Sequence, residues 1–204
     1  MLNRLMKQIF NKQGSQSFAR QHKVMIRLQD QVATYPNKSL NVPQDRGSKI
    51  EGALKLRQAK ESDLENFVAL EAKGYQGYLA WTLDDFKQDW VQNSHLLYLV
   101  AECFTEDNKY FVGMITGRFL VDHTHISQLI VDPLWQSLGV GSYLLESWLY
   151  LSRFLAKKSV TLEVRESNCR AQKLYYRYGF QQVAKKEFYY EDNREAALLL
   201  RCLI

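Results

Sequence analysis

The sequence predicts an α/β domain with a mixed central sheet and helices on both faces, preceded by a basic N-terminal extension. One observation is that hydrophobic periodicity alternates along the chain between the two-residue period of strands and the 3.6-residue period of amphipathic helices. A second is the predicted order β-α-α-β-β-β-α-β-α-β-β, in which hairpin strands precede strand–helix–strand units. A third is composition, since 46% of the 204 residues are hydrophobic and 13% are aromatic, enough for one sizeable core.

Residues 1–50 differ from the remainder in charge and composition. They hold nine Lys or Arg residues and two Asp, a balance of +7, whereas the other 154 residues carry a balance of −2. Apolar residues recur at helical spacing near the start, which predicts a short amphipathic helix. Residues 36–49 contain two of the three prolines among short polar side chains, a composition typical of a linker. We therefore expect 1–50 to be a flexible extension and linker, and 51–204 to be one domain.

The role of the extension is open among three alternatives. A basic, acid-poor, amphipathic start is typical of an organelle transit peptide. The same charge also suits weak contact with RNA or an anionic surface. The third alternative is a solvated extension without a dedicated partner. No residue of the extension belongs to a pattern associated with catalysis.

The domain begins with a strand followed by two helices. The alternation A-L-K-L-R-Q at 53–58 predicts the strand. Apolar residues at helical spacing over 61–75 predict the first helix. Thr82 precedes the acidic segment L-D-D-F-K-Q-D-W, and a Thr ahead of acidic residues is a helix-start signal, so the second helix begins there.

Three strands come next. Residues 96–104 and 110–121 are apolar stretches joined by T-E-D-N-K, a connection typical of a hairpin. Residues 126–131 form the third strand, which is stopped by Asp132-Pro133.

The last third of the chain alternates between helix and strand. The long helix at 139–157 carries an apolar stripe, and the short helix at 169–178 has Asn168 as its N-cap and Gly179 as its left-handed terminator. The remaining strands are predicted at 160–164, 181–190 and 196–203.

The segment L-W-Q-S-L-G-V-G joins a strand to the long helix. Gly139 and Gly141 allow a tight turn that exposes successive N–H groups, and the helix adds the positive end of its dipole. Together these form a cradle suited to a diphosphate. The segment is not the dinucleotide fingerprint, because Leu144 replaces its third glycine, and no Gly-Lys-Ser/Thr of a P-loop follows. A purely structural turn is the alternative.

Two further side chains are candidates for chemistry. In V-T-L-E-V-R, Glu163 lies on the face of the strand opposite the apolar residues. Its alternative role is an ordinary charge on a half-exposed strand. Tyr175 lies on the apolar face of the short helix, where a core tyrosine is the alternative.

Taken in order and spacing, Q-S-L-G-V-G, L-E-V-R-E-S-N and A-Q-K-L-Y-Y-R-Y-G-F resemble the GNAT-type acetyltransferases over roughly 54–204. The segment from L-E-V-R onward and the tail with F-Y-Y-E-D and A-A-L-L-L resemble the RimI branch. Those enzymes acetylate the N-terminal amine of a ribosomal protein. The resemblance implies a GNAT fold, acetyl-CoA as cosubstrate and a peptide or protein N-terminus as acceptor.

The resemblance also implies roles for individual residues. Glu163 matches the general base and Tyr175 the general acid of a direct attack on the thioester. Backbone groups of Ile130 and Val131 would bind the pantetheine arm, and Asn168 would contact it. The diphosphate would lie on Gln136, Ser137, Leu138, Gly139, Val140, Gly141 and Ser142. Ser137 and Leu138 replace the arginines usual in this loop, which implies greater reliance on backbone N–H groups.

Other functions are less consistent with the sequence. No apolar run reaches the roughly 18 residues needed to span a bilayer. Three widely spaced cysteines indicate neither a disulfide framework nor a zinc ribbon, and they fit a reducing, cytoplasm-like compartment. His123 and His125 have the spacing of metal ligands, but a third ligand is missing, so no metal site is expected. The open alternatives are a GNAT enzyme for a small amine or lysine, and a non-catalytic CoA-binding module.

Overall fold

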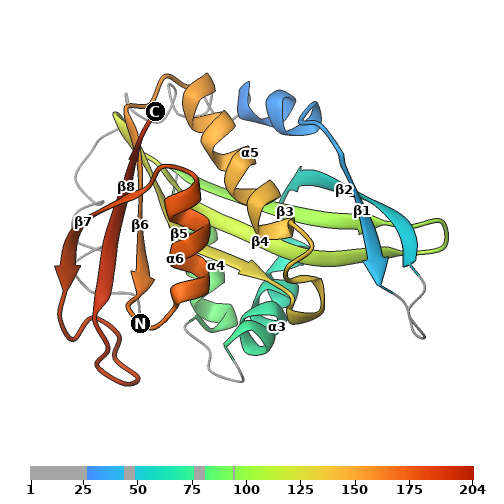
Figure 1. The fold of residues 1–204 in the computed structure, drawn as a ribbon. Helices are drawn as coiled ribbons and strands as arrows, with labels where there is room; N and C mark the ends of the chain where they lie inside the picture. The colour runs from blue at the N-terminus through green and yellow to red at the C-terminus, as the bar shows by residue number, and fades with distance from the viewer. Residues whose placement is uncertain (1–26, 44–48, 76–80, 94) are drawn as a thin grey trace.

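The computed structural model describes residues 27–43, 49–75, 81–93 and 95–204. Eight strands form one sheet in the order β1-β2-β3-β4-β5-β6-β8-β7, in which β5 and β6 are the parallel pair and the other neighbours are antiparallel (Figure 1). The strands are β1 Lys38–Pro43, β2 Lys49–Gln58, β3 Leu96–Phe104, β4 Lys109–Phe119, β5 His123–Val131, β6 Ser159–Arg165, β7 Gln181–Lys186 and β8 Ala197–Leu203. The predicted mixed sheet is confirmed.

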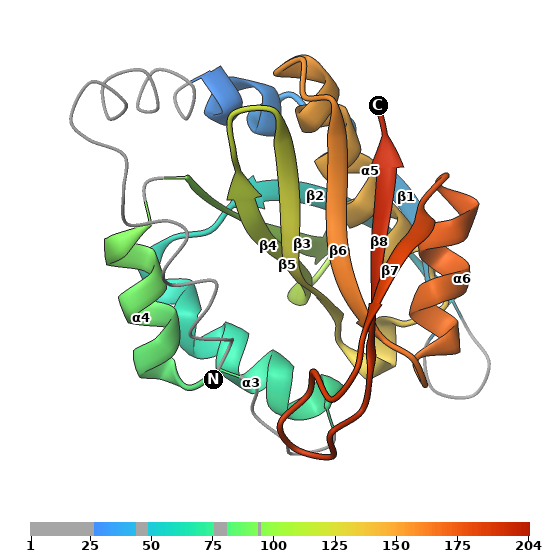
Figure 2. The ribbon, with the colours of Figure 1, turned by 90° about the vertical axis from the view of Figure 1, so that its left-hand side faces the viewer.

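Helices cover both faces of this sheet, as predicted (Figures 1 and 2). The helices α3 (Leu64–Gly74) and α4 (Leu83–Gln92) lie on one face, and α5 (Val140–Phe154) and α6 (Cys169–Arg177) lie on the other. Thr82 caps α4 as expected, because its hydroxyl accepts the N–H of Asp85 while the Asp85 carboxylate accepts the N–H of Thr82.

Each face of the sheet has its own buried cluster. Trp148 and Leu144 of α5 are fully buried against one face, and Phe67 of α3 and Phe86 of α4 are fully buried against the other. The two predicted amphipathic stripes therefore bury their apolar sides against opposite faces of one sheet.

The predicted linker at 36–49 is wrong over the described part of that segment. Residues 38–43 form edge strand β1, which pairs with β2 from Lys38↔Leu54 to Pro43↔Lys49. Before it, residues 27–33 form a helix whose Leu28 is fully buried in the core. Proline is tolerated here because Pro43 is the last residue of an edge strand. Residues 1–26 and 44–48 of the expected extension lie outside the described residues.

Two elements end three or four residues before their predicted ends. The strand predicted to reach Tyr190 stops at Lys186, and Phe188 then has a positive φ of 56°. The long helix ends at Phe154, three residues early, and Ala156 has a φ of 51°. Left-handed backbone conformations of this kind cannot continue a strand or a helix.

No helix in the described parts of the chain is long and apolar enough to cross a membrane.

Candidate active site

The parallel pair β5–β6 opens into a gap part-way along its length. Its four residue pairs end at Ile126 and Leu162, although β5 continues to Val131 and β6 continues to Arg165. β4 and β8 pair with the outer edges of these strands throughout. Beyond the last pair, the facing edges of β5 and β6 therefore lack a strand partner.

One of the two predicted backbone positions faces this gap. Ile130 pairs with Met114 of β4, and the N–H of Asp132 donates to the carbonyl of Val112 at 3.0 Å. Alternate residues of an antiparallel ladder direct their backbone groups to opposite sides. Val131 therefore directs its N–H and C=O toward the gap, whereas the backbone of Ile130 is directed toward β4.

The loop after β5 presents a row of backbone N–H groups. Ser137 and Gly139 have left-handed φ angles of 65° and 89°, and Gly139 is the N-cap of α5. The N–H groups of residues 140–142 form the first turn of that helix and have no acceptor among the described residues. Gln136 donates from its side chain to the carbonyl of Val131 at 3.1 Å, which fixes the loop to the end of β5. This geometry fits a diphosphate group.

The other loop residues have local roles in the structure. Leu138 packs against the core cluster, and the hydroxyl of Ser142 accepts a hydrogen bond from Arg177 at 3.0 Å. Asn168 is the N-cap of α6, since its side-chain oxygen accepts the N–H of Ala171 at 3.0 Å.

Glu163 is held between two basic side chains on the face of the sheet that carries α3 and α4. Its carboxylate lies 2.7 Å from the Lys186 ammonium and 3.2 Å from the Nε2 atom of His125. Burial alone would raise the pKa of Glu163, but the hydrogen bonds and charges of His125 and Lys186 lower it to about 2. The carboxylate is therefore fully charged near neutral pH and weakly basic.

Tyr175 is a buried residue of α6, and the centre of its ring lies 5.7 Å from that of Phe180. Burial, and to a smaller extent the nearby Tyr75, raises the pKa of this phenol well above its ordinary value. The hydroxyl is therefore protonated at physiological pH and can act as a donor.

Tyrosines connect the surroundings of Glu163 with those of Tyr175. Tyr190 lies within electrostatic range of Glu163 and of Tyr75, at the C-terminal end of α3, and Tyr75 lies within range of Tyr175. The family resemblance would also place Tyr75 and Tyr190, with Trp81, Tyr78 and Tyr189, beside an acceptor cleft, with core packing as the alternative. Tyr78 is outside the described residues. Trp81 is instead buried in the core cluster under α3 and α4.

The segment between β7 and β8 is anchored to the end of β6. Arg165 makes two hydrogen bonds to the Asp192 carboxylate, at 2.8 and 2.9 Å, and one to Glu195 at 3.2 Å. Its guanidinium also lies 3.8 Å from the centre of the Tyr190 ring. These contacts hold Tyr190 beside the strand that carries Glu163.

A buried carboxyl group fixes the start of α4 to the sheet. Glu71 of α3 has no exposed surface, and it accepts hydrogen bonds from the N–H of Trp81 and from the side-chain amide of Gln128 on β5. Burial raises the pKa of Glu71 to about 7, although both hydrogen bonds oppose the shift.

Sequence reasoning missed His125 and Lys186 as members of the site. His125 was considered as a metal ligand, whereas the structure directs its Nδ1 toward the Thr161 hydroxyl at 3.0 Å and its Nε2 toward Glu163. The role of His125 follows from the strand register, in which His125 of β5 pairs with Thr161 of β6. A single sequence does not reveal that register. Lys186 comes from β7, two strands away in the sheet. Among the described residues no group of three side chains could hold a metal ion.

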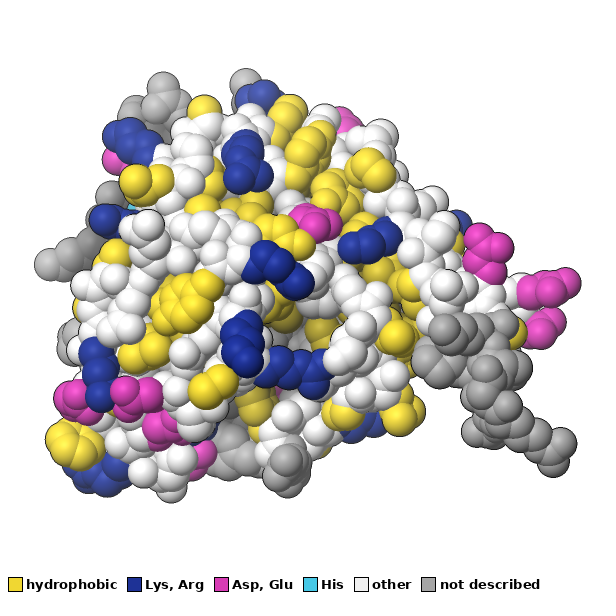
Figure 3. Space-filling view, in the orientation of Figure 1, with side chains coloured by type: hydrophobic (Ala, Val, Ile, Leu, Met, Phe, Trp, Pro, Cys, Tyr) yellow, Lys and Arg dark blue, Asp and Glu magenta, His cyan; other side chains and the backbone are white. Residues whose placement is uncertain are grey.

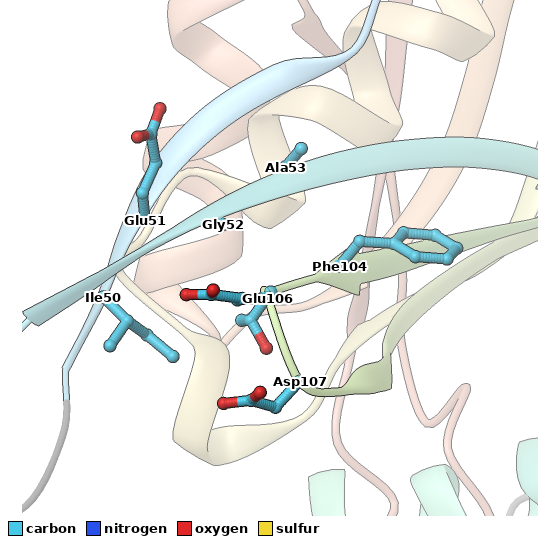
Figure 4. A pocket seen from close by; sticks show the side chains of 8 residues that line it. Ile50, Glu51, Gly52, Ala53, Phe104, Glu106 and Asp107 are labelled. Atoms are coloured by element: carbon cyan, nitrogen blue, oxygen red, sulfur yellow. The ribbon is translucent and has the colours of Figure 1, made fainter.

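A separate pocket lies at the β3–β4 connection (Figure 4). Its volume is about 480 Å³, and the carboxylates of Glu51, Glu106 and Asp107 are part of its lining. Figure 4 shows Glu51 directed away from Asp107. None of the predicted site residues lines this pocket, so it is distinct from the gap between β5 and β6.

Residues 58–180 match the Acetyltransferase (GNAT) family, which covers more than half of the chain. The chain belongs to the GNAT acetyltransferases. This match includes the open gap, the loop before α5, Glu163 and Tyr175. The expected family is therefore confirmed, and the protein is an acetyl-CoA-dependent N-acetyltransferase.

Individual GNAT proteins are similar over most of the domain. The N-alpha-acetyltransferase of Sulfurisphaera tokodaii is 35% identical over 158 residues, covering 71% of this chain and 90% of the relative. The ribosomal protein bS18-alanine N-acetyltransferase of Haemophilus ducreyi is 30% identical over 113 residues, covering 54% and 77%. The crystal structure of the ribosomal-protein-S18-alanine N-acetyltransferase from Escherichia coli has a TM-score of 0.63 at 23% identity, covering 74% and 94%, and shows the same fold.

Proposed function

We propose that this GNAT enzyme acetylates the N-terminal α-amine of a protein, with a ribosomal protein as the leading acceptor class. The observation that carries the proposal is the open β5–β6 gap, which leads from the amide-lined loop to the face where Glu163 lies. Relatives named for acetylating the alanine of ribosomal protein bS18 support the acceptor class. Acetylation of a ribosomal protein would take place where ribosomes are assembled, in the cytoplasm.

In this proposal the chain binds acetyl-CoA in the gap. The loop from Gln136 to Ser142 holds the diphosphate, and the backbone of Val131, the side chain of Asn168 and the adjacent strand edge hold the pantetheine arm. The N–H of Val131 faces the thioester carbonyl and stabilises the negative oxygen that forms during attack. Because these donors are fixed by the sheet and by α5, little reorganisation accompanies the reaction.

The nucleophile has to be a neutral amine. At pH 7 the neutral form of an α-amine costs about 1 kcal/mol, whereas that of a lysine costs roughly 4–5 kcal/mol, at 1.36 kcal/mol per pKa unit. A carboxylate with a pKa of about 2 cannot remove the proton of an α-ammonium group outright, since the gap of about 6 units corresponds to about 8 kcal/mol. The α-amine is therefore the better matched acceptor for this site.

Glu163 acts as the base after attack has begun. The amine nitrogen gains positive charge as it bonds to the thioester carbon, and Glu163 stabilises that charge and accepts the proton, directly or through one water. As the C–S bond breaks, the Tyr175 hydroxyl donates a hydrogen bond and then its proton to the leaving sulfur, and the phenolate regains a proton from solvent. Attack is direct, so the exposed Cys169 is not required as a nucleophile.

The test is acetylation of peptides that differ at their first two residues, followed by mass spectrometry. We expect an acetyl group on the α-amine, and no product from the same peptides blocked at the N-terminus but carrying a free lysine. Glu163→Gln should lower kcat by about 10²–10⁴-fold and Tyr175→Phe by a similar range, typical of positioned proton donors and acceptors. Full activity in both variants would refute the assigned roles, and turnover of small amines alone would refute the acceptor class.

A further inference from the structure

Basic side chains from two other elements surround the loop that precedes α5. Arg170 of α6 donates to the side-chain oxygen of Gln136 at 2.6 Å and to the Ser137 hydroxyl at 2.9 Å. Arg177, two turns further along α6, donates to the Ser142 hydroxyl at 3.0 Å. The residues of α6 that face the loop are thus seven positions apart, on one side of the helix.

The third basic side chain comes from β1, outside the part of the chain that matches the family. The ammonium of Lys38 lies 3.6 Å from the position that a Cβ atom would occupy on Gly139. Gly139 is also the left-handed N-cap whose turn exposes the loop amides. Lys38 of β1 therefore places a positive charge beside Gly139, in the middle of the loop. Figure 3 shows Lys and Arg side chains gathered on this face of the molecule, around α5 and α6.

These three charges are not neutralised by carboxylates. Among the described residues, neither Lys38 nor Arg170 nor Arg177 forms an ion pair. The described basic side chains that do pair with Asp or Glu are Arg57, Lys73, Lys109, Arg118, Lys158, Arg165, Lys185 and Lys186, with His125 also beside a carboxylate.

The acidic groups closest to the loop in sequence have partners of their own. Asp132 is paired with Lys73 at 2.9 Å and accepts the N–H of Leu134. Glu146 accepts the hydroxyl of Tyr178. The surface over the loop therefore has an excess of positive charge beside unpaired N–H groups, which is the arrangement that phosphate groups favour.

We propose that Lys38 of β1 and Arg170 and Arg177 of α6 bind the phosphate groups of acetyl-CoA and replace the arginines that this loop lacks. The proposal rests on the placement of the diphosphate described above and extends it to charges outside the loop. Acetyl-CoA carries a diphosphate and a 3′-phosphate, about four negative charges near neutral pH, so three cations offset most of that charge. Arginine retains unused N–H donors after bonding Gln136 and Ser137, and these can reach an anion above the loop.

The experiment measures affinity for acetyl-CoA by calorimetry on the full-length chain. We expect Lys38→Gln and Arg170→Gln each to weaken the Kd about tenfold, the effect of losing one charge-assisted hydrogen bond. Lys38→Arg and Arg170→Lys retain the charge and should restore most of the affinity. The control is Lys87→Gln, which removes an exposed lysine from α4 on the opposite face of the sheet.

A second measurement isolates the phosphates. S-acetylpantetheine has the thioester arm but lacks the nucleotide, so the ratio of kcat/KM for acetyl-CoA to that for S-acetylpantetheine should fall about tenfold in both Gln variants. Melting temperatures close to wild type establish that the variants are folded. The inference is overturned if the Gln variants bind acetyl-CoA as Lys87→Gln does, while the proposed placement of acetyl-CoA survives. It is overturned together with that placement if the wild type gives no binding heat.

Discussion

Glu163 combines burial with two basic neighbours from different strands. His125 comes from β5 and Lys186 from β7, so the charge on Glu163 depends on the register of three strands. The side chain of Glu163 is 11% exposed and that of Lys186 is 41% exposed, so the lysine forms the outer member of the pair.

Replacing Lys186 should raise the pKa of Glu163. In Lys186→Met the carboxylate loses one of the two side chains whose interactions lower its pKa to about 2, so the value should rise by about one unit or more toward 4.5. Carbon-13 NMR titration of the Glu163 carboxyl measures this directly. Lys185→Met is the matched control, because Lys185 pairs with Glu166 and Glu187 instead. An unchanged Glu163 pKa in Lys186→Met would show that His125 alone holds the charge.

Among the elements, β1 and the preceding helical residues 27–33 extend the domain beyond the family match. The hydroxyl of Tyr143 on α5 donates to the carbonyl of Pro36 at 3.1 Å, and Arg27 lies 5.2 Å from the centre of the Phe154 ring. The segment thus crosses the face of α5 before it joins the sheet as β1. We propose that the folded domain includes residues 27–43, within the first 50 residues of the chain.

Two shortened chains test this boundary. A chain that begins at residue 44 lacks four buried apolar side chains that a chain beginning at residue 27 retains, namely Leu28, Val32, Leu40 and Val42. At about 1.5–3 kcal/mol for each buried side chain, the difference in the free energy of unfolding should be about 6 kcal/mol or more. Urea unfolding of the two chains measures it. Equal urea midpoints for the two chains would contradict this proposal and support a domain that begins after residue 50.

At the scale of the whole molecule, buried carboxyl groups make stability depend on pH in opposite directions. Glu163 has a lowered pKa, so its stabilising contribution to the free energy of unfolding is present above pH 4.5 and is lost as the pH falls toward 2. Glu71 has a raised pKa, so its contribution is present below pH 4.5 and is lost as the pH rises through about 7. Between pH 5 and 8, Glu71 is the one of these two that titrates.

Glu71→Gln should remove this pH dependence. The shift from 4.5 to about 7 corresponds to roughly 3 kcal/mol of stability lost by the wild type above pH 7. Gln128, whose side-chain oxygen has no partner, can turn its amide to accept from the new glutamine. Chemical unfolding at pH 5 and pH 8 measures the free energy of unfolding, and the variant should become more stable relative to wild type at the higher pH. Glu65→Gln, exposed on the same helix, is the control, and identical pH slopes in all three proteins would contradict the assignment to Glu71.

The sequence predicted the elements of 51–204 because their periodicity is local, and it predicted the family because three motifs occur in order. It did not predict β1, since two alternating apolar residues, Leu40 and Val42, lie between prolines that indicate a linker. It also did not predict Lys186 beside Glu163 or Lys38 beside Gly139. Those contacts join segments that lie far apart in the chain, and only the order and register of the strands bring them together.

Four residue pairs between β5 and β6 form the only strand-to-strand seam between the five-stranded and three-stranded parts of the described sheet. Beyond that seam the two parts face each other across unpaired backbone edges. If acetyl-CoA binds there as proposed, its contacts with both strand edges would lengthen this junction and stabilise the sheet.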